Sequence, residues 1–267
     1  MGKREERCGM DPVDLDTRRN TLMVSEIFGP TFQGEGPQAG RLAVFLRLGR
    51  CNLDCAWCDT PFTWDWKGKN GTVYDPKVEL TRMDVADVCD EVRDLMPCAG
   101  TTRLVISGGE PMIQRQGLLS LVSELRSLGV MNIDIETNGT KPPLVTPYEN
   151  QYFSEDAVSY VISPKLPSSG VVFDIRWLDV IKQYRELSYI ECADLKFVIQ
   201  DGADMVEAER IIDYAEFPPS RVWLMPEGRT QADLDKNAPY VAAEALEHEV
   251  NYTDRLHIRI WNDKRGV

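Results

Sequence analysis

Apolar residues recur along the chain in short runs, separated by longer segments in which they return every three or four positions. Short runs are typical of buried strands, and the wider spacing is typical of helices that pack on one face. The runs predict strands at Leu42–Leu48, Arg103–Ser107, Val130–Glu136, Ser159–Ser163, Ala193–Gln200, Arg221–Met225 and, last, Leu256–Trp261.

The segments between these runs predict helices. Thr81 is followed by Asp84 three residues later, as expected for a helix N-cap, and the apolar positions after it include Cys89. Cys89 is therefore predicted to be a core residue and not a ligand. Residues 61–78 predict an irregular excursion or hairpin. Further helices are predicted at Leu118–Leu128, Trp177–Leu187, Ala203–Ala215 and 238–250.

Alternation of strands and helices favours an α/β fold with a mostly parallel sheet. About six βα units fit the pattern, fewer than a closed eightfold barrel needs, so a partial (β/α)6 barrel is expected. Polar and glycine-rich segments follow nearly every predicted strand, at the edge where such folds bind ligands. Five segments are expected to converge there: the cysteine loop after Leu48, the turn at 108–111, Glu136, Lys165 and the turn at 225–228.

Composition limits the partners of this chain. It has 267 residues and a net charge of −13, which argues against binding to nucleic acid phosphates. No apolar run approaches the roughly 20 residues of a membrane span, so no membrane is expected. Residues 1–20 are charged and lack the apolar core of a secretory signal, which predicts a flexible N-terminus and a cytoplasmic protein. Residues 21–267 are predicted to form one domain.

Three cysteines lie close together directly after the Leu42–Leu48 run. Cys51, Cys55 and Cys58 form a C-x3-C-x2-C motif. A structural zinc site normally has four protein ligands, and so does a common four-iron cluster. Three thiolates therefore indicate a cluster with one iron left for a ligand that is not protein.

A structural zinc site is the main alternative, because paired cysteines are often zinc ligands. No second pair completes such a site, since Cys98 follows Pro97 in a predicted turn. His248 and His257 do not have ligand spacing either. Seven cysteines in a chain without a secretory signal argue against a disulfide framework.

The cysteine motif, together with Gly108-Gly109-Glu110-Pro111 after the next predicted strand, resembles the radical S-adenosylmethionine superfamily. Within it, Phe32–Gly36, Arg47–Thr60 and His257–Val267 resemble the 7-carboxy-7-deazaguanine synthase family. The resemblance implies a partial (β/α)6 barrel of the radical S-adenosylmethionine type. It also implies a carbon–nitrogen lyase of 7-deazapurine and queuosine biosynthesis, which contracts 6-carboxy-5,6,7,8-tetrahydropterin to 7-carboxy-7-deazaguanine with loss of ammonia.

The resemblance further implies a [4Fe-4S] cluster on Cys51, Cys55 and Cys58, with S-adenosylmethionine on the open iron. Reductive cleavage of that cofactor yields the adenosyl radical that attacks the substrate, so no side chain is assigned as catalytic. For Trp57, loop packing is an equal explanation, and for Lys165 a solvated surface position is the alternative. Cofactor contacts are implied for Trp57, Asp59, Gly109, Glu136, Asn138, Ser163, Pro164, Lys165, Met225, Pro226, Glu227 and Gly228.

The amide of Gln33 and the carboxylate of Glu35 suit the hydrogen-bonding edge of a pterin. The resemblance implies that Arg47 pairs with the substrate carboxylate; a surface ion pair is the explanation without it. Thr60 is implied as a ligand of Mg²⁺, which prefers oxygen; capping of the turn before Pro61 is the alternative. The implied substrate contacts are Phe32, Gln33, Gly34, Glu35, Arg47, Ser107 and Val267.

Two other functions fit parts of the sequence. An activating enzyme that places a glycyl radical on a partner protein shares the cysteines and the Gly-Gly-Glu turn, but not Phe32–Gly36 or Thr60. A non-catalytic zinc-binding protein needs the cysteines alone. The family resemblance also implies a homodimer and an electron donor such as flavodoxin.

Overall fold

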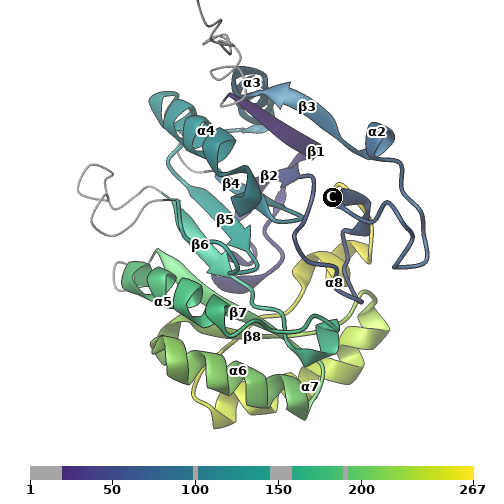
Figure 1. Cartoon of the computed structure of the whole chain (residues 1–267), viewed down its shortest axis with the longest axis vertical. Helices are drawn as coiled ribbons and strands as arrows, with labels where there is room; N and C mark the ends of the chain where they lie inside the picture. The colour runs from purple at the N-terminus through teal and green to yellow at the C-terminus, as the bar shows by residue number, and fades with distance from the viewer. Residues whose placement is uncertain (1–19, 99–101, 145–157, 189–191) are drawn as a thin grey trace, which may run out of the picture.

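The computed structural model of the chain describes residues 20–98, 102–144, 158–188 and 192–267. Within this part all strands form one sheet in the order β3-β1-β2-β4-β5-β6-β7-β8-β9 (Figure 1). Pairing is parallel from β2 to β9, and β1 is antiparallel to both of its neighbours. The strands are β1 Thr21–Phe32, β2 Leu42–Leu48, β3 Thr81–Asp84, β4 Arg103–Gly108, β5 Ile133–Thr137, β6 Ser159–Ile162, β7 Ala193–Ile199, β8 Val222–Pro226 and β9 Asn251–Tyr252.

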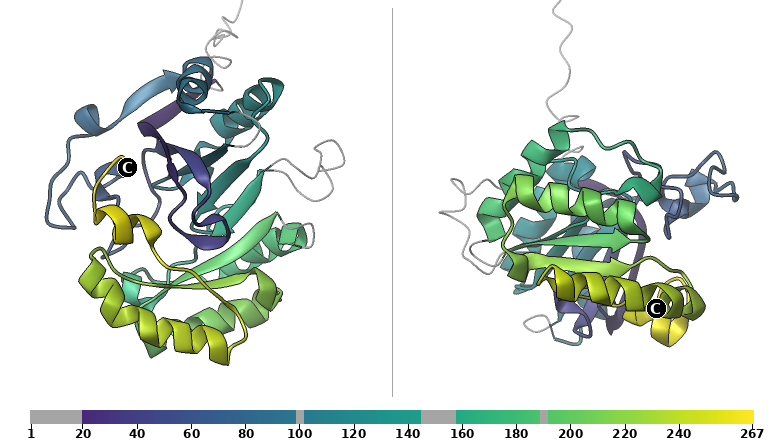
Figure 2. Two further views of the ribbon diagram at one scale, coloured as in Figure 1. Left: turned by 180° about the vertical axis from the view of Figure 1, so that it is seen from behind. Right: turned by 90° about the horizontal axis from the view of Figure 1, so that it is seen from below.

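The long helices cover the outer face of the curved sheet (Figures 1 and 2). Helices α5 and α6 pack on β7, α7 packs on β8, and α3 packs on β1 and α4. They are α3 Val85–Leu95, α4 Arg115–Ser127, α5 Arg176–Ser188, α6 Gly202–Ala215 and α7 Gln231–Glu247. The short helices are η1 Gly36–Gln38, η2 Pro61–Thr63, α2 Pro76–Glu79, η3 Pro111–Gln114, η5 Pro167–Ser169, η6 Pro219–Arg221 and α8 Leu256–Trp261.

The core lies between these helices and the sheet. Leu46, Ile106, Ile135 and Phe197, from four different strands, are fully buried. Each such side chain stabilises the fold by about 1.5–3 kcal/mol relative to an exposed position. Cys89 is also buried in this core, as predicted. The sheet ends at β3 and β9 without closing, so the predicted α/β fold, an incomplete barrel with mostly parallel strands, is confirmed.

Strand β1 was not predicted from the sequence. Gly29 and Pro30 interrupt its apolar run, and both residues disfavour strand interiors. The structure accommodates them with a shift of the β1–β2 register between Phe28 and Thr31. The Leu42–Leu48 strand is therefore the second strand and not the first.

Two predicted helix starts were wrong. Thr81 is not an N-cap but begins β3, which pairs with the start of β1, and α3 begins at Val85 with Asp84 as its N-cap residue. The helix predicted at 238–250 is α7, which begins earlier, behind a capping box of Thr230 and Asp233. Pro239, inside this helix, hid its first two turns from the sequence pattern.

The strand predicted at Leu256–Trp261 is also wrong, because this segment forms helix α8. Its apolar and polar residues alternate, as in a strand. However, the Leu256 amide donates to the Gly34 carbonyl (2.8 Å), and this contact turns the chain away from the sheet edge. The two-residue strand β9 takes that edge instead.

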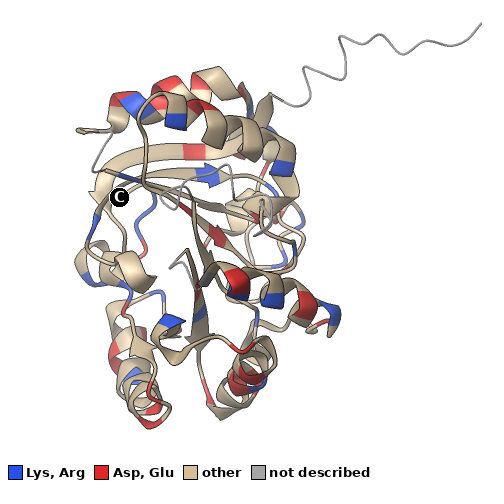
Figure 3. Cartoon of the chain, turned by 90° about the vertical axis from the view of Figure 1, so that its left-hand side faces the viewer, with Lys and Arg blue, Asp and Glu red and all other residues tan. Residues whose placement is uncertain are grey.

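Acidic and basic side chains are interspersed along the outer helices (Figure 3). In the described part of the chain, no helix is both long and apolar enough to cross a membrane. The flexible N-terminus predicted for residues 1–20 lies, apart from Asn20, outside the described residues. The single domain at 21–267 stays a prediction.

Candidate active site

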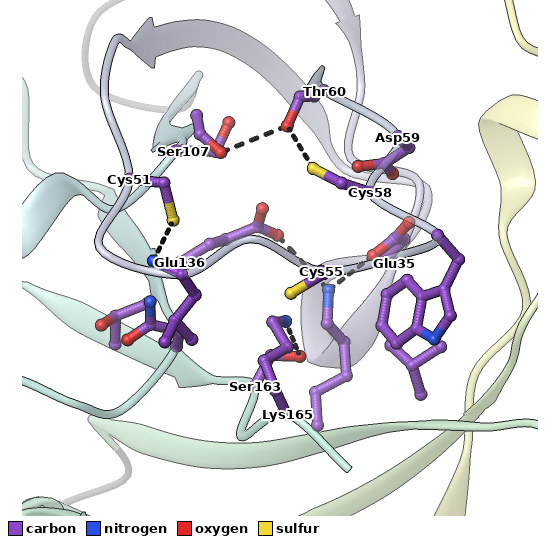
Figure 4. A pocket seen from close by; sticks show the side chains of 18 of the residues that line it. Glu35, Cys51, Cys55, Cys58, Asp59, Thr60, Ser107, Glu136, Ser163 and Lys165 are labelled. Carbon is purple, nitrogen blue, oxygen red and sulfur yellow. Dashed lines mark hydrogen bonds and ion pairs between the residues drawn. The ribbon is translucent and has the colours of Figure 1, made fainter. Parts of the chain in front are cut away.

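The loop after β2 carries all three clustered cysteines into one cavity (Figure 4). We call it the cysteine cavity, defined by Cys51, Cys55 and Cys58. The described residues that line it include no fourth cysteine and no histidine. This donor set fits a four-iron cluster with three protein thiolates and one iron open to another ligand.

The cysteine loop is held in place by contacts with two other segments. Trp64 Nε1 donates to the Cys58 sulfur (3.3 Å), and the Ala56 amide donates to the Ser169 carbonyl (2.8 Å). Burial raises the pKa of Cys51 to about 12 and also raises the pKa of Cys55 and of Cys58. Since metals bind thiolates, loading a metal centre at this loop must displace three protons.

Gly109 follows β4 and lies directly against the cysteine loop. A Cβ atom at this position would lie 1.9 Å from the Arg50 carbonyl oxygen, so no other residue fits without moving the loop. The Gly109 amide donates to the Leu48 carbonyl (3.0 Å), and the Glu110 amide donates to the Arg50 carbonyl (2.9 Å). The Gly-Gly-Glu turn and the cysteine loop therefore form one backbone unit.

Glu110 joins this unit to the end of β5. Its side chain is fully buried and accepts hydrogen bonds from the Thr137 hydroxyl and the Asn138 amide, both at 2.7 Å. Burial raises the pKa of Glu110, although these bonds oppose the shift. Asn138 in turn donates to the Asn52 side chain of the cysteine loop (3.1 Å). The turn after β5 is thus tied to the loop that bears the thiols.

Most of the predicted cofactor contacts line the cysteine cavity. Lys165 Nζ lies 3.3 Å from Ser163 Oγ and 5.8 Å from the centre of the Trp57 ring. Lys165 is therefore a cavity residue and not a solvated surface lysine. The predicted cofactor contacts that line the cavity are Trp57, Asp59, Gly109, Glu136, Asn138, Ser163, Lys165, Met225 and Glu227. The other predicted contacts, Pro164, Pro226 and Gly228, do not line it. The predicted convergence of the loops on one edge of the sheet is confirmed.

A second cavity adjoins the first, and we call it the arginine cavity after Arg47. All of the predicted substrate contacts line it, namely Phe32, Gln33, Gly34, Glu35, Arg47, Ser107 and Val267. The two cavities share the wall formed by Glu35, Asp59, Thr60, Ser107, Gly108 and Glu136. A molecule in one cavity is therefore next to a molecule in the other.

A charge network joins the shared wall to the rest of the cysteine cavity, and all of its members except Asp59 are largely buried. Glu35 Oε2 lies 2.5 Å from Lys196 Nζ, and Glu35 Oε1 lies 2.8 Å from Arg255 Nε. Arg255 also donates to Asp59 Oδ2 (2.5 Å) and to the Gly228 carbonyl (2.7 Å). We call Glu35, Asp59, Lys196 and Arg255 the charged cluster.

Both signs of charge are stabilised in this cluster. Burial alone would raise the pKa of Glu35, but attraction by Lys196 and Arg255 outweighs it and holds the pKa well below its usual value. Burial alone would lower the pKa of Lys196, but Glu35 outweighs it and raises that pKa. Asp59 likewise has a lowered pKa, because Arg255 overcomes its burial. At neutral pH the cluster is fully ionised.

Within the described part of the chain, the Arg47 guanidinium is hydrogen-bonded through its Nε atom only. Its Nε donates to Glu26 Oε1 (2.6 Å), and its guanidinium lies 5.6 Å from the Phe28 ring and 5.7 Å from the Phe62 ring. Among the described residues, no acceptor binds its Nη atoms. Arg47 therefore does have an ion pair, but this pair leaves both Nη groups as further donors.

Thr60 lies where the two cavities meet. Its hydroxyl lies 3.4 Å from the Gly108 carbonyl oxygen and 3.7 Å from the Cys58 sulfur. It makes no side-chain cap on η2, so turn capping does not explain this residue. Thr60 lines both cavities.

The loop at 33–36 is seated on the last helix. A Cβ atom on Gly34 would lie 2.1 Å from His257 Nδ1, so only glycine permits this approach. The Gly36 amide donates to the Thr253 hydroxyl (2.9 Å). These contacts aim Gln33 and Glu35 into the arginine cavity, where Gln33 Nε2 donates to Glu136 Oε1 (3.2 Å).

Sequence reasoning missed several residues of the site, among them Lys196, Arg255 and His257. Lys196 had a usable signal, because a lone lysine within the apolar run of β7 must find a charged partner when buried. Arg255 directly precedes the segment predicted as a strand and had no signal of its own. His257 belongs to that segment, and although His257–Val267 resembles the family, no role was assigned to it.

Comparisons with known proteins agree with this geometry. A model of a 4Fe-4S single cluster domain matches residues 32–157. A crystal structure of QueE from Escherichia coli superposes with a TM-score of 0.63, at 22% identity, over 91% of this chain and 98% of that one. With three clustered thiols on a mostly parallel, incomplete barrel, these findings indicate an iron–sulfur protein with the radical S-adenosylmethionine fold.

Proteins of similar sequence identify the family to which the chain belongs. The chain is 30% identical to 7-carboxy-7-deazaguanine synthase of Rhodopirellula baltica, over 98% of this chain and 95% of the relative. It is 32% identical to that of Pyrobaculum aerophilum, over 92% and 97%. It is 29% identical to that of Bacillus subtilis, over 92% and 98%. The chain belongs to the 7-carboxy-7-deazaguanine synthase family.

Proposed function

We propose that this chain converts 6-carboxy-5,6,7,8-tetrahydropterin to 7-carboxy-7-deazaguanine, with loss of ammonia. The observation that carries the proposal is the pair of adjoining cavities. One holds three thiols, the other holds Arg47, and Glu35 belongs to their shared wall. A cofactor in the first can act directly on a small anionic heterocycle in the second.

Cys51, Cys55 and Cys58 would hold a [4Fe-4S] cluster in the cysteine cavity. The cluster and S-adenosylmethionine, when bound, supply reductive cleavage of a sulfonium bond and hence a carbon radical that removes hydrogen. The protein's own part is to hold this cofactor and to exclude water. The Trp57 and Trp64 rings line the cavity beside the thiols and suit the second task.

Cofactor contacts come from the ends of several strands. Gly109 offers backbone at close range, and Asn138 offers an amide fixed by Asn52. Ser163 and Lys165 supply donors from the segment after β6. Lys165 is the cation for a carboxylate, such as that of the methionine part.

Substrate recognition follows from the charged cluster and Arg47. Glu35 is an ionised acceptor held from two sides, which suits the donor edge of a pterin. Arg47 offers its open Nη edge to the substrate carboxylate. Ser107 and Glu136 line both cavities, so they would orient the ring toward the cysteine cavity.

Thr60 is proposed to bind Mg²⁺ through its hydroxyl, with substrate oxygens and water as further ligands. Its place on the wall of both cavities supports this role. We also propose that the protein is a cytoplasmic homodimer that receives electrons from a flavodoxin-type donor.

Anaerobic purification and product analysis test the function. With iron, sulfide, S-adenosylmethionine, Mg²⁺ and a chemical reductant, the protein should convert 6-carboxytetrahydropterin to 7-carboxy-7-deazaguanine and release ammonia. Cleavage of S-adenosylmethionine without this product would contradict the synthase and favour the glycyl-radical activating enzyme. A colourless protein that contains zinc would contradict both enzymes.

A further inference from the structure

The C-terminal end of the chain lies next to α2 and β1 (Figure 1), and part of it lines the arginine cavity. Lys264, Gly266 and Val267 line that cavity, but Arg265 does not. The Arg265 side chain instead binds the surrounding framework. It donates to Glu26 Oε2 on β1 and to Glu79 Oε2 on α2, both at 2.8 Å.

The Arg265 side chain also makes a cation–π contact. Its guanidinium carbon lies 3.8 Å from the centre of the Phe62 ring in η2. A cation at this distance from an aromatic face is attracted by the electrons of the ring. Although the Arg265 side chain is 43% exposed, both glutamates are only 16% exposed, so its partners are largely shielded from water.

Glu26 serves two arginines at once. Its Oε1 accepts from Arg47 Nε (2.6 Å), and its Oε2 accepts from Arg265 Nε (2.8 Å). The two arginines together offset the charges of Glu26 and Glu79. Without Arg265, this group would carry an excess negative charge beside the donors that Arg47 turns to the cavity, and an acidic ligand would be disfavoured.

We propose that Arg265 is a positioning residue that latches residues 262–267 over the arginine cavity and, by sharing Glu26 with Arg47, keeps Arg47 available for an acidic substituent. This rests on the proposed function, because it assumes that a carboxylated pterin occupies the cavity. The latch makes cavity closure and carboxylate selection depend on the same carboxylate, Glu26.

Binding and hydrogen exchange test this on the protein without cluster or substrate. The stable probes are 6-carboxypterin and pterin, which differ in the carboxylate alone, and binding is followed by pterin fluorescence. Arg265→Gln should weaken binding of 6-carboxypterin by about tenfold and of pterin by less than about threefold, since a charge pair is lost near the carboxylate alone. Peptides covering 262–267 should exchange their amide hydrogens at least about tenfold faster.

Arg210→Gln is the matched control. Arg210 also pairs with a glutamate, Glu207, and lies over an aromatic ring, Phe173, but on α6 and outside both cavities. This variant should leave both affinities and the exchange of 262–267 unchanged. If Arg265→Gln does not fold by circular dichroism, Glu79→Gln replaces it. Exchange of 262–267 should again become faster, though by less, because one of the two carboxylates that hold Arg265 is lost. The preference for 6-carboxypterin should not fall in this variant, because a negative charge and not a positive one is removed.

Each outcome decides a part of the proposal. Unchanged exchange in Arg265→Gln would refute the latch. Faster exchange with an unchanged preference for 6-carboxypterin over pterin would refute the sharing of Glu26. If the unaltered protein binds neither pterin, the proposed ligand is wrong, while the exchange of 262–267 still shows whether Arg265 holds the segment.

Discussion

The cysteine loop and the charged cluster meet at one wall but are built in opposite ways. The three thiols come from a stretch of eight residues, Cys51 to Cys58. The charged cluster joins Glu35 to Arg255 across 220 positions of the chain. A local motif keeps its chemistry wherever its loop is supported, whereas a distributed cluster exists only when the whole barrel is assembled.

The two regions should therefore respond differently to substitution. Loss of a thiol removes the metal centre and leaves the core intact. Loss of a charge in the cluster leaves its buried partner with fewer opposite charges, so it should affect both ligand binding and the stability of the fold.

Cys55→Ala is expected to have the largest effect, a complete loss of bound iron and of S-adenosylmethionine cleavage. Iron and sulfide content after anaerobic reconstitution measure it, together with 5′-deoxyadenosine formation. Cys89→Ala is the control, since Cys89 lies in the core. It should keep the iron and lower the free energy of unfolding by about 1 kcal/mol. Iron at the unaltered level in Cys55→Ala would remove Cys55 as a ligand.

Lys196→Met should separate the charged cluster from the cysteine loop, because it changes the cluster and leaves the loop unaltered. The side chain of Lys196 is 5% exposed, and its loss leaves Glu35 with Arg255 as its remaining close cation. The free energy of unfolding should fall by about 3 kcal/mol, while reconstituted iron stays normal. Lys182→Met, which breaks an exposed ion pair with Glu216, should change the free energy of unfolding by less than about 0.5 kcal/mol. Equal effects of the two variants in urea unfolding would contradict a structural role for the cluster.

Thr60→Ala tests the point where the two regions meet. The variant should bind iron normally but need about tenfold more Mg²⁺ for half-maximal activity, because one hard oxygen ligand is lost. Thr60→Ser, which keeps the hydroxyl, should restore the normal requirement. Mg²⁺ titrations identical for all three proteins would rule out Thr60 as a ligand.

Low pH should weaken the ion pairs of the charged cluster, and this is the smallest of the four effects that we expect. The pKa of Glu35 is lowered in the folded protein, because Lys196 and Arg255 outweigh its burial. Glu35 contributes fully to the free energy of unfolding when the pH is above its pKa in the unfolded chain, which is about 4.3. This contribution is lost as the pH falls through the lower pKa of Glu35 in the folded protein. The stability difference between the unaltered protein and Glu35→Gln should therefore narrow below about pH 4.3. A constant difference in urea unfolding from pH 7 to pH 3 would contradict the ion pairs.

Much of the fold was predictable because its signals are local. The buried runs of β2, β4, β7 and β8 gave the parallel strands, and the turns after them gave the ligand-binding edge. The errors fell where tertiary contacts overrule local pattern. Strand β1 tolerates Gly29 and Pro30 through a register shift, and α8 replaces a strand because Leu256 binds the Gly34 carbonyl.

The sequence by itself determined the thiol donors and the Gly-Gly-Glu turn, since neighbouring residues in a loop must stay near one another in any fold. Only the tertiary structure decided that Lys196 and Arg255 hold Glu35, and that Arg265 shares Glu26 with Arg47. Coulomb attraction depends on distance in space, and burial strengthens it by excluding water. Neither quantity can be read from positions along a chain before it has folded.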